Sequence, residues 1–309
     1  MSTRAILVTG ATGKQGSAVI DALIKANTNL EIIALTRNAQ SPSAKKLQQK
    51  SPKINIITGN LDAINDVFQR AKEVTRAPIW GVFSVQIAIG DGQNVQSEER
   101  QGKALVDAAL SNGVSHFVYS SVDRGGATAS NTTPTYVPHF ASKYNVEQHL
   151  FNKAKGSDMT WTVLRPVAFL DNLTADFFGK HFSTTWQMML AKDKKLQMVA
   201  TSDIGWFAAE AFVKPEAKEY RNESISLAGD ELTFGEFKTI FERKTGQKLP
   251  TTFRLVSMFI NWMVKELGTM WRWFRDVGYG TDIARLRAMN PALKDFATWL
   301  ETESAWKTR

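Results

Sequence analysis

Short apolar runs alternate with amphipathic stretches along the first half of the chain. The runs have the length and β-branched content of strands, and the stretches between them repeat apolar residues at helical spacing. The predicted strands are Ala5–Thr9, Glu31–Thr36, Ile54–Thr58, Ile79–Val85, His116–Ser120 and Thr160–Leu164. The predicted helices are Lys14–Ala26, Pro42–Gln49, Ile64–Ala71, Val95–Ser111 and Val137–Lys153. This β-α-β order predicts an α/β protein with a doubly wound parallel sheet and helices on both faces.

Beyond Leu164 the alternation breaks. The pattern there predicts a helix over Ser202–Val213, a strand over Glu223–Ala228 and helices over Thr233–Lys244 and Pro291–Glu301. Thr233 followed by Glu236 forms a capping box, and Gly246 ends that helix. The Ser/Thr/Asn-rich segment Ala127–Thr135 predicts a mobile loop. We expect two domains, a sheet domain over residues 1–165 and a smaller α+β C-terminal lobe over 166–309, interleaved with it.

Three glycines follow the first predicted strand directly. Gly10, Gly13 and Gly16 are spaced Gly-x-x-Gly-x-x-Gly, and an amphipathic helix pattern continues from Ser17. Glycine lets the backbone turn sharply and approach a pyrophosphate, which the N–H groups and dipole of the helix N-terminus then hold. A plain strand-to-helix turn that binds nothing can carry such glycines, but the strand before and the helix after favour a dinucleotide.

Arg37 follows the second predicted strand, where a dinucleotide site reads the adenosine ribose. An NAD site usually has Asp or Glu there, whereas an arginine suits the 2′-phosphate of NADP. Lys14, Asn38, Ser41 and Lys45 are further donors near this position. The alternative is a solvated surface arginine at a strand end. The sequence favours the phosphate contact and therefore NADP.

Composition and residue spacing exclude several kinds of site and of partner. The 309 residues carry 38 basic and 30 acidic side chains, a net charge of +8, and no cysteine. Disulfides, thiolate metal ligands and thiol catalysis are therefore excluded. The histidines, at positions 116, 139, 149 and 181, lack paired metal-ligand spacing, and no helix-turn-helix pattern is present. The sequence shows no signal-peptide pattern and no uninterrupted apolar span. We therefore expect the protein to be cytoplasmic, or nuclear if it is regulatory. We expect no membrane, nucleic-acid or metal partner.

Several motifs together carry a resemblance to a known family. They are Val8-Thr-Gly-Ala-Thr-Gly-Lys-Gln-Gly16, Leu35-Thr-Arg-Asn38, Gln101-Gly-Lys-Ala-Leu105, His116-Phe-Val-Tyr-Ser-Ser121, Pro138-His-Phe-Ala-Ser-Lys-Tyr-Asn-Val-Glu147, Leu164-Arg-Pro and Met289-Asn-Pro-Ala-Leu-Lys-Asp-Phe-Ala-Thr-Trp-Leu300. With these motifs the chain resembles the NmrA-like family, an atypical branch of the short-chain dehydrogenase/reductase superfamily, over nearly its whole length.

The resemblance implies a Rossmann-like domain that binds NADP. The implied cofactor contacts are Gly10, Ala11, Thr12, Gly13, Lys14, Gln15, Gly16, Arg37, Asn38, Asn60, Leu61, Val85, Gln86, Ile87, Lys143, Phe169, Leu170, Asp171 and Asn172. One departure concerns the segment Asn60-Leu-Asp62, where the acid more usual right after glycine comes two residues later.

The implied catalytic residues are His139 and Lys143. Ordinary short-chain reductases place Tyr-x-x-x-Lys on one helix face, where lysine holds the nicotinamide ribose and tyrosine passes the proton. Here the sequence is His139-Phe-Ala-Ser-Lys143, with histidine in the tyrosine position. Histidine, whose unperturbed pKa is about 6.5, can donate a proton. Alternatively His139 is a packing residue at a helix start.

Other side chains near these motifs have two interpretations each. Ser120 or Ser121 can polarise a substrate carbonyl or cap a loop, and Arg124 follows them. Tyr136 and Lys103 are weaker candidates for a catalytic role, since Tyr136 can be a loop residue and Lys103 a solvated helix residue. Tyr144 lies one residue off the helix face of Lys143 and is a poor substitute for the catalytic tyrosine.

Aromatic and methionine residues gather in the C-terminal part. Leu255, Phe259 and Trp262 recur at helical spacing, as do Ile260, Met263, Leu267 and Met270. Such stripes form a core, the wall of an apolar ligand site, or a partner surface. We therefore hold two functions open. One is an NADP-dependent oxidoreductase that reduces a carbonyl or activated double bond of a small apolar molecule. The other is a non-catalytic NADP(H) sensor that binds a transcription factor or another protein.

Overall fold

The computed structural model describes residues 3–90 and 92–308, so positions 1, 2, 91 and 309 of the predicted domains lie outside the described residues. Two compact units are built from interleaved stretches of chain. Unit 1 contains the chain up to Ser121, Ser142–Arg165 and Ile204–Ile225, and unit 2 contains Val122–Ala141, Pro166–Asp203 and the chain from Ser226 onward. The predicted domain division at 165/166 stays a prediction.

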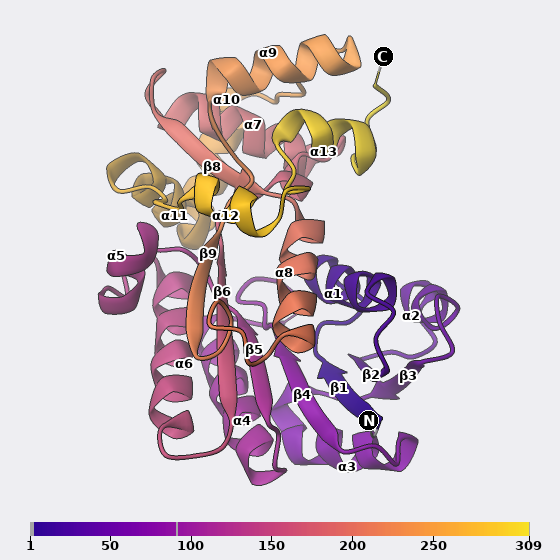
Figure 1. Ribbon diagram of the computed structural model, residues 1–309. Helices are drawn as coiled ribbons and strands as arrows, with labels where there is room; N and C mark the ends of the chain where they lie inside the picture. The colour runs from indigo at the N-terminus through magenta and orange to yellow at the C-terminus, as the bar shows by residue number, and fades with distance from the viewer. Residues whose placement is uncertain (1–2, 91, 309) are drawn as a thin grey trace. The chain divides into compact units, whose positions relative to one another are not determined.

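Unit 1 is organised by a seven-stranded sheet in the order β3-β2-β1-β4-β5-β6-β9 (Figure 1). Its strands are β1 (Arg4–Val8), β2 (Leu30–Thr36), β3 (Ile54–Thr58), β4 (Ile79–Ser84), β5 (His116–Ser120), β6 (Thr160–Pro166) and β9 (Glu223–Leu227). The pairings from β3 through β6 are parallel. The order of the first six is that of dinucleotide-binding sheets, whose ligands lie at the carboxyl edge where the strand order reverses. The predicted α/β class is therefore confirmed.

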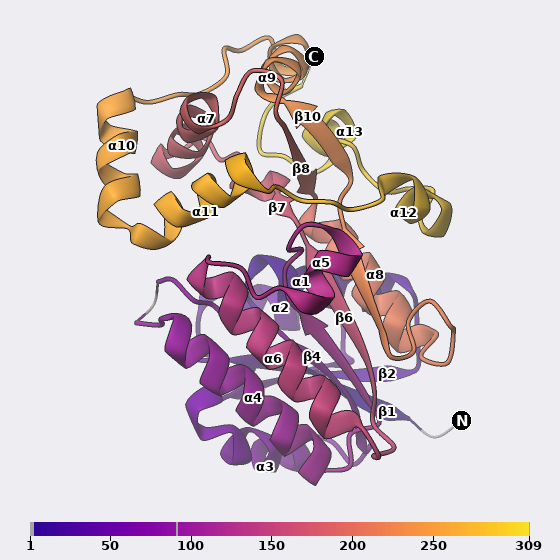
Figure 2. The ribbon, with the colours of Figure 1, turned by 90° about the vertical axis from the view of Figure 1, so that its left-hand side faces the viewer.

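Helices cover both faces of this sheet. They are α1 (Lys14–Lys25), α2 (Pro42–Gln48), α3 (Ile64–Val74), α4 (Val95–Ser111), α6 (Pro138–Ala154) and α8 (Thr201–Val213), with the 3-10 turn η1 (Leu61–Ala63) before α3. Alternate strand residues such as Leu7 and Phe117 pack with α3, α4 and α6, which lie side by side in Figure 2. Phe212 of α8 packs against Gly81 on the other face. Successive residues of each strand point to opposite faces of the sheet, and both faces are buried, as the continuous apolar runs indicate.

Unit 2 has an α+β core of its own. A second sheet has the order β10-β8-β7, formed by β7 (Ala168–Phe169), β8 (Lys195–Val199) and β10 (Asp230–Thr233). The remaining elements are α5 (Gly126–Thr132), η2 (Leu170–Asn172), α7 (Phe177–Met189), α9 (Phe234–Thr245), α10 (Arg254–Met263), α11 (Lys265–Asp276), α12 (Ile283–Met289) and α13 (Phe296–Thr302). Trp186, Trp271 and Trp273 are buried in this core. Among the described residues, no helix is long and apolar enough to span a bilayer.

Two local predictions were wrong. Most of the predicted loop Ala127–Thr135 belongs to helix α5, because the Asp123 carboxylate accepts the N–H groups of Gly125 and Gly126 and starts the helix. The last helix begins at Phe296 rather than Pro291, because the Asp295 side chain caps it by accepting the Thr298 N–H at 2.7 Å. The expected capping box of α9 is confirmed, with Gly246 in the left-handed conformation after it.

Candidate functional site

The glycine turn closes on itself at the carboxyl end of β1. Gly10 has φ +57°, and a Cβ atom on Gly16 would lie 2.2 Å from the Gly10 carbonyl oxygen. The Thr9 hydroxyl joins this turn to the end of β4, because it accepts the Val85 N–H at 2.8 Å and lies 3.2 Å from the Val85 carbonyl oxygen. Both glycines are therefore required by backbone geometry, and the turn has a fixed position between β1 and β4.

The N-terminus of α1 follows this turn. Gly13 is the N-cap; among the described residues no side chain caps it, and the first turn of α1 carries no acid. A helix start without a side-chain cap leaves backbone N–H groups for an anion, and the helix dipole favours negative charge there. This arrangement fits a pyrophosphate, as the sequence predicts.

The next two strands end in polar side chains. Arg37 and Asn38 are exposed after β2, and Ser41 accepts the Ala44 N–H as the N-cap of α2. Asn60 caps η1 by accepting the Asp62 N–H at 3.1 Å. The hydroxyl of Ser41 and the amide oxygen of Asn60 thus already have local structural roles, and Arg37 lies exposed directly after β2. Its contact with the 2′-phosphate of NADP stays a prediction.

Leu61 and Asp62 start the 3-10 turn after β3. Leu61 packs against the core of unit 1. The Asp62 carboxylate accepts hydrogen bonds from Arg100 at 2.7 Å and from Gln101 at 3.1 Å, and the Arg100 contact in particular lowers the pKa of Asp62. Asp62 therefore fixes the start of α4 to the edge of the sheet.

Val85, Gln86 and Ile87 follow β4. Gln86 is buried and its amide donates to the Ser84 hydroxyl at 3.0 Å. Its Oε1 atom is buried without a hydrogen-bond partner among the described residues. Ile87 is half exposed. A buried amide oxygen that lacks a donor is costly in the empty protein and favours a ligand that brings one.

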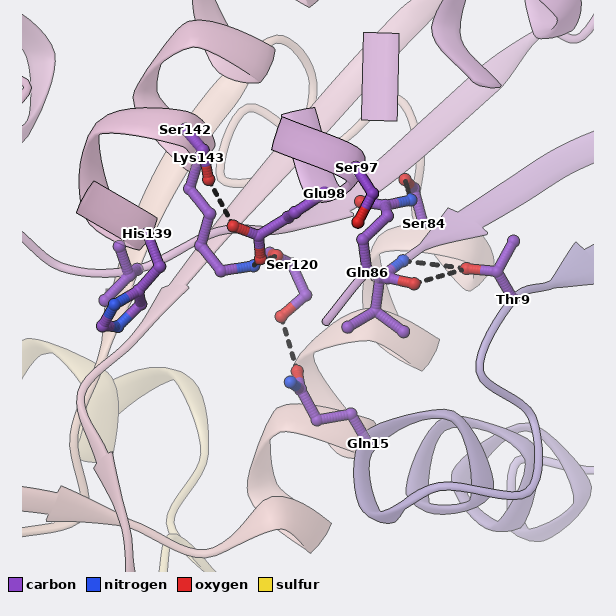
Figure 3. A network of polar contacts seen from close by, with 12 residues as sticks. Thr9, Gln15, Ser84, Gln86, Ser97, Glu98, Ser120, His139, Ser142 and Lys143 are labelled. Atoms are coloured by element: carbon purple, nitrogen blue, oxygen red, sulfur yellow. Dashed lines mark hydrogen bonds and ion pairs between the residues drawn. The ribbon is translucent and has the colours of Figure 1, made fainter. Parts of the chain in front are cut away.

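The side chain of Lys143, on helix α6, reaches the carboxyl end of β5. Its ammonium is 3.0 Å from the carboxylate of the buried Glu98 and 3.5 Å from the Ser120 carbonyl oxygen. Ser142 donates its hydroxyl to the same Glu98 carboxylate, as Figure 3 shows. The Ser120 hydroxyl donates to Gln15 Oε1 at 2.5 Å, which joins β5 to the glycine turn. The predicted residues Gln15 and Lys143 are thus brought to one sheet edge through Ser120.

Glu98 is a residue that the sequence prediction missed. It lies in the first turn of α4, which begins with a capping box between Asn94 and Ser97. Its carboxylate accepts a hydrogen bond from the Ser142 hydroxyl and forms an ion pair with Lys143, the next residue of α6. No local motif marks it, and the one available signal is a glutamate on the buried face of an amphipathic helix, where charged side chains are rare unless paired.

His139 belongs to unit 2 and has a carboxylate partner there. Its ring Nδ1 contacts Glu266 Oε1, and the same oxygen accepts the His139 backbone N–H at 2.8 Å. Burial alone would raise the pKa of Glu266, but the hydrogen bonds from the His139 ring and backbone outweigh it and lower that pKa. Glu266 therefore holds the ring by one nitrogen, an arrangement that orients a histidine for proton transfer.

The other candidates have structural partners. Lys103 pairs with Glu99 at 2.5 Å, and the Tyr136 hydroxyl donates to Asp276 at 3.3 Å. Phe169 to Asn172 lie in unit 2, in β7 and η2, where the Asp171 carboxylate accepts the Thr201 N–H at 3.0 Å. Arg124 is buried and donates to the Val122 carbonyl oxygen at 3.0 Å. Cofactor contacts by Phe169, Leu170, Asp171 and Asn172 stay predictions.

Among the described residues, no group of His, Asp and Glu side chains could hold a metal ion. The chain matches the sequence profile of the NmrA-like family over residues 2–301. An NmrA-like family domain-containing oxidoreductase of Aspergillus japonicus is 32% identical over 268 residues, which cover 79% of this chain and 73% of that protein.

Solved structures with low sequence identity share the fold. NmrA, a negative transcriptional regulator in complex with NADP, superposes with a TM-score of 0.68 at 16% identity, covering 98% of this chain and 96% of that chain. The triphenylmethane reductase of Citrobacter sp., complexed with NADP(H), gives 0.67 at 19% identity, with 95% and 98% covered. From the family profile and the curated relative, the chain belongs to the NmrA-like family.

Proposed function

We propose that this protein is an NADP-dependent oxidoreductase that reduces a carbonyl or an activated double bond of a small, apolar molecule. The glycine turn at the β1–β4 switch point, followed by an uncapped helix start, carries this proposal. The name of the Aspergillus relative as an oxidoreductase and the NADP(H) complex of the Citrobacter reductase support it.

NADPH, when bound, supplies the hydride. Lys143, held by Glu98, would donate to the hydroxyls of the nicotinamide ribose and fix its orientation. Ser120, which already donates to Gln15, offers its hydroxyl oxygen beside Lys143. His139, oriented by Glu266 through Nδ1, delivers a proton to the substrate from its other ring nitrogen. Each role uses a group that the fold has already ordered, which limits the entropy lost on binding.

Cofactor choice tests the first part of the proposal. We expect NADPH to bind at least about tenfold more tightly than NADH, because two or more charge-assisted bonds from Arg37 to the 2′-phosphate exceed the about 1.4 kcal/mol of one decade. Arg37→Asp should remove or reverse this preference in fluorescence titrations. Lys46→Asp, an exposed charge reversal on α2, is the matched control and should keep it. Equal affinities in the wild-type protein would contradict the assignment of Arg37.

Turnover tests the second part. NADPH consumption is measured against a panel of quinones, enones and aromatic ketones. His139→Ala should lower kcat about a hundredfold or more, the usual contribution of a general acid, with the NADPH affinity unchanged. His149→Ala is the control, because His149 also pairs with a carboxylate, Asp107, at 2.9 Å. Unchanged turnover in His139→Ala would remove the proton-donor role.

The second candidate is a non-catalytic NADP(H) sensor that regulates a protein partner. The histidine in the tyrosine position and the fold shared with the regulator NmrA favour it. A sensor would bind NADPH and NADP⁺ with different affinities and would consume none with any compound of the panel. Tight cofactor binding without turnover would therefore select this function over the first.

A further inference from the structure

Helix α10 presents apolar side chains to solvent. Leu255, Met258, Phe259 and Trp262 follow the i, i+3, i+4, i+7 spacing of one helix face. Their exposed fractions are 78%, 55%, 56% and 74%, and the Phe259 and Trp262 rings lie 5.9 Å apart. We call these four residues the α10 face. Phe253 and Met263, also exposed, extend it at both ends of the helix. Contiguous exposed apolar surface of this kind is uncommon unless something binds it.

On the side of α10 that packs against α7, two polar residues, Ser257 and Asn261, make hydrogen bonds. The Ser257 hydroxyl contacts His181 Nδ1 of α7 at 3.2 Å and is fully buried. Asn261, one turn later, donates to the Thr185 hydroxyl at 3.4 Å. Rotating the helix to bury its apolar side would leave these polar groups on α7 without their partners, which is costly. Hydrogen bonds to α7 therefore hold the α10 face outward.

The charged residues along the chain near this face are mostly basic. From Gly246 to Lys265 the sequence contains Lys248, Arg254 and Lys265, all exposed, and no acid. The nearest acid along the chain, Glu266, is engaged with His139. On α7 the N-cap Asp176 is exposed, but so is Lys180. A second copy of this chain on the same face would bring like charges together, whereas an anionic surface would be attracted.

We propose that the α10 face docks the protein onto an anionic lipid surface. A ten-residue helix is about 15 Å long and cannot cross a bilayer, so it lies in the interfacial plane. Leu255, Met258 and Phe259 enter the acyl boundary, and Trp262 takes the interfacial position that its ring prefers. Arg254 and Lys265 contact the headgroups. This proposal does not depend on the oxidoreductase activity.

Co-flotation with vesicles tests the proposal on the full-length protein. We expect binding to vesicles of about 70% phosphatidylcholine and about 30% phosphatidylserine, weak binding to pure phosphatidylcholine, and weakening by salt. Arg254→Glu should raise the apparent lipid Kd about thirtyfold, since it removes one cation and adds an anion near the surface. The double variant Leu255→Ser/Trp262→Ser should weaken binding at least about tenfold.

Controls separate docking from folding. Val213→Ser removes an exposed apolar side chain at the end of α8 and should bind lipid like the wild-type protein. All variants should keep the wild-type thermal midpoint and NADPH affinity, because the substituted side chains are exposed. No binding to the anionic vesicles at millimolar lipid overturns the proposal. So does binding that both α10 variants leave unchanged. A dimer in sedimentation that Leu255→Ser/Trp262→Ser dissociates would assign the face to a second copy instead.

Discussion

Removing the charge of Glu98 should release Lys143 from its position. The Glu98 carboxylate is buried and lies 3.0 Å from the Lys143 ammonium, which is itself largely buried. Glu98→Gln keeps the shape of the side chain and an oxygen that can accept a hydrogen bond. The change therefore removes the negative charge with little effect on packing, and it leaves the Lys143 ammonium with less compensation.

The geometry sets the size of the effect. At 3.0 Å and an effective dielectric constant of about 20, the attraction between the two charges is about 5–6 kcal/mol. Part of it offsets the cost of removing both groups from water, and the amide that replaces the carboxylate would still hydrogen-bond. We therefore expect Glu98→Gln to lower the free energy of unfolding by about 2–3 kcal/mol. We also expect about tenfold weaker NADPH binding, because Lys143 loses its fixed position.

A double-mutant cycle measures this coupling. Urea unfolding is followed for the wild-type protein, Glu98→Gln, Lys143→Met and the double variant. The double variant should regain most of the stability lost in Glu98→Gln, with a coupling energy of about 2 kcal/mol. Ser142→Ala, which removes only the hydroxyl donor to Glu98, is the control and should cost less. A coupling energy below about 0.5 kcal/mol would refute the inference that Glu98 positions Lys143 by charge.

Three further changes have defined outcomes. Gly16→Ala places a Cβ atom 2.2 Å from the Gly10 carbonyl oxygen, so calorimetry should show about 1–3 kcal/mol lower stability and titration a loss of NADPH binding. Gly235→Ala, whose Cβ meets nothing closer than 3.9 Å, should be tolerated. Burial, helped by the Arg221 charge, lowers the pKa of His116 to about 4, below its unfolded value of about 6.5. The stability it contributes, up to about 3 kcal/mol, is present above about pH 6.5 and lost as the pH falls toward about 4. His116→Gln should therefore reduce the dependence of the unfolding free energy on pH, measured by urea titrations between about pH 7.5 and about pH 4.5. The same pH dependence in the variant and the wild-type protein would contradict the burial effect. Glu266 holds the His139 ring, so Glu266→Gln should lower kcat about tenfold or more in stopped-flow assays without changing NADPH affinity, and an unchanged kcat would separate Glu266 from proton transfer.

Sequence periodicity predicted the sheet domain because its signals are local. Each strand of β1 to β6 is a short apolar run, and the Gly10–Gly16 turn lies where two such signals meet. The strands of the second sheet were missed, because β7 and β10 have only two and four residues and the alternation of β8 extends over only five. Helix α5 was missed because a composition typical of loops is overridden by the hydrogen bonds of Asp123.

Periodicity and local motifs could not predict contacts between side chains that are distant in sequence. Arg37 could be named because it directly follows a predicted strand, and Lys143 because the segment His139–Lys143 resembles the Tyr-x-x-x-Lys motif of short-chain reductases. Glu98 and Glu266 could not, since they meet Ser142 and His139 across 44 and 127 positions of chain. The outward orientation of α10 was likewise hidden, because the same stripe of Leu255, Phe259 and Trp262 is typical of a buried core.

The carboxylate of Glu98 has a consequence for descent within the family. A lineage that loses Lys143 retains a buried negative charge with a weaker partner, and Ser142 alone compensates it poorly. Selection should then favour replacement of Glu98 soon afterwards, whereas a lineage that still needs the lysine should keep both. Positions 98 and 143 are therefore expected to covary, and their joint loss would mark relatives that lack the proposed contact of this lysine with the cofactor.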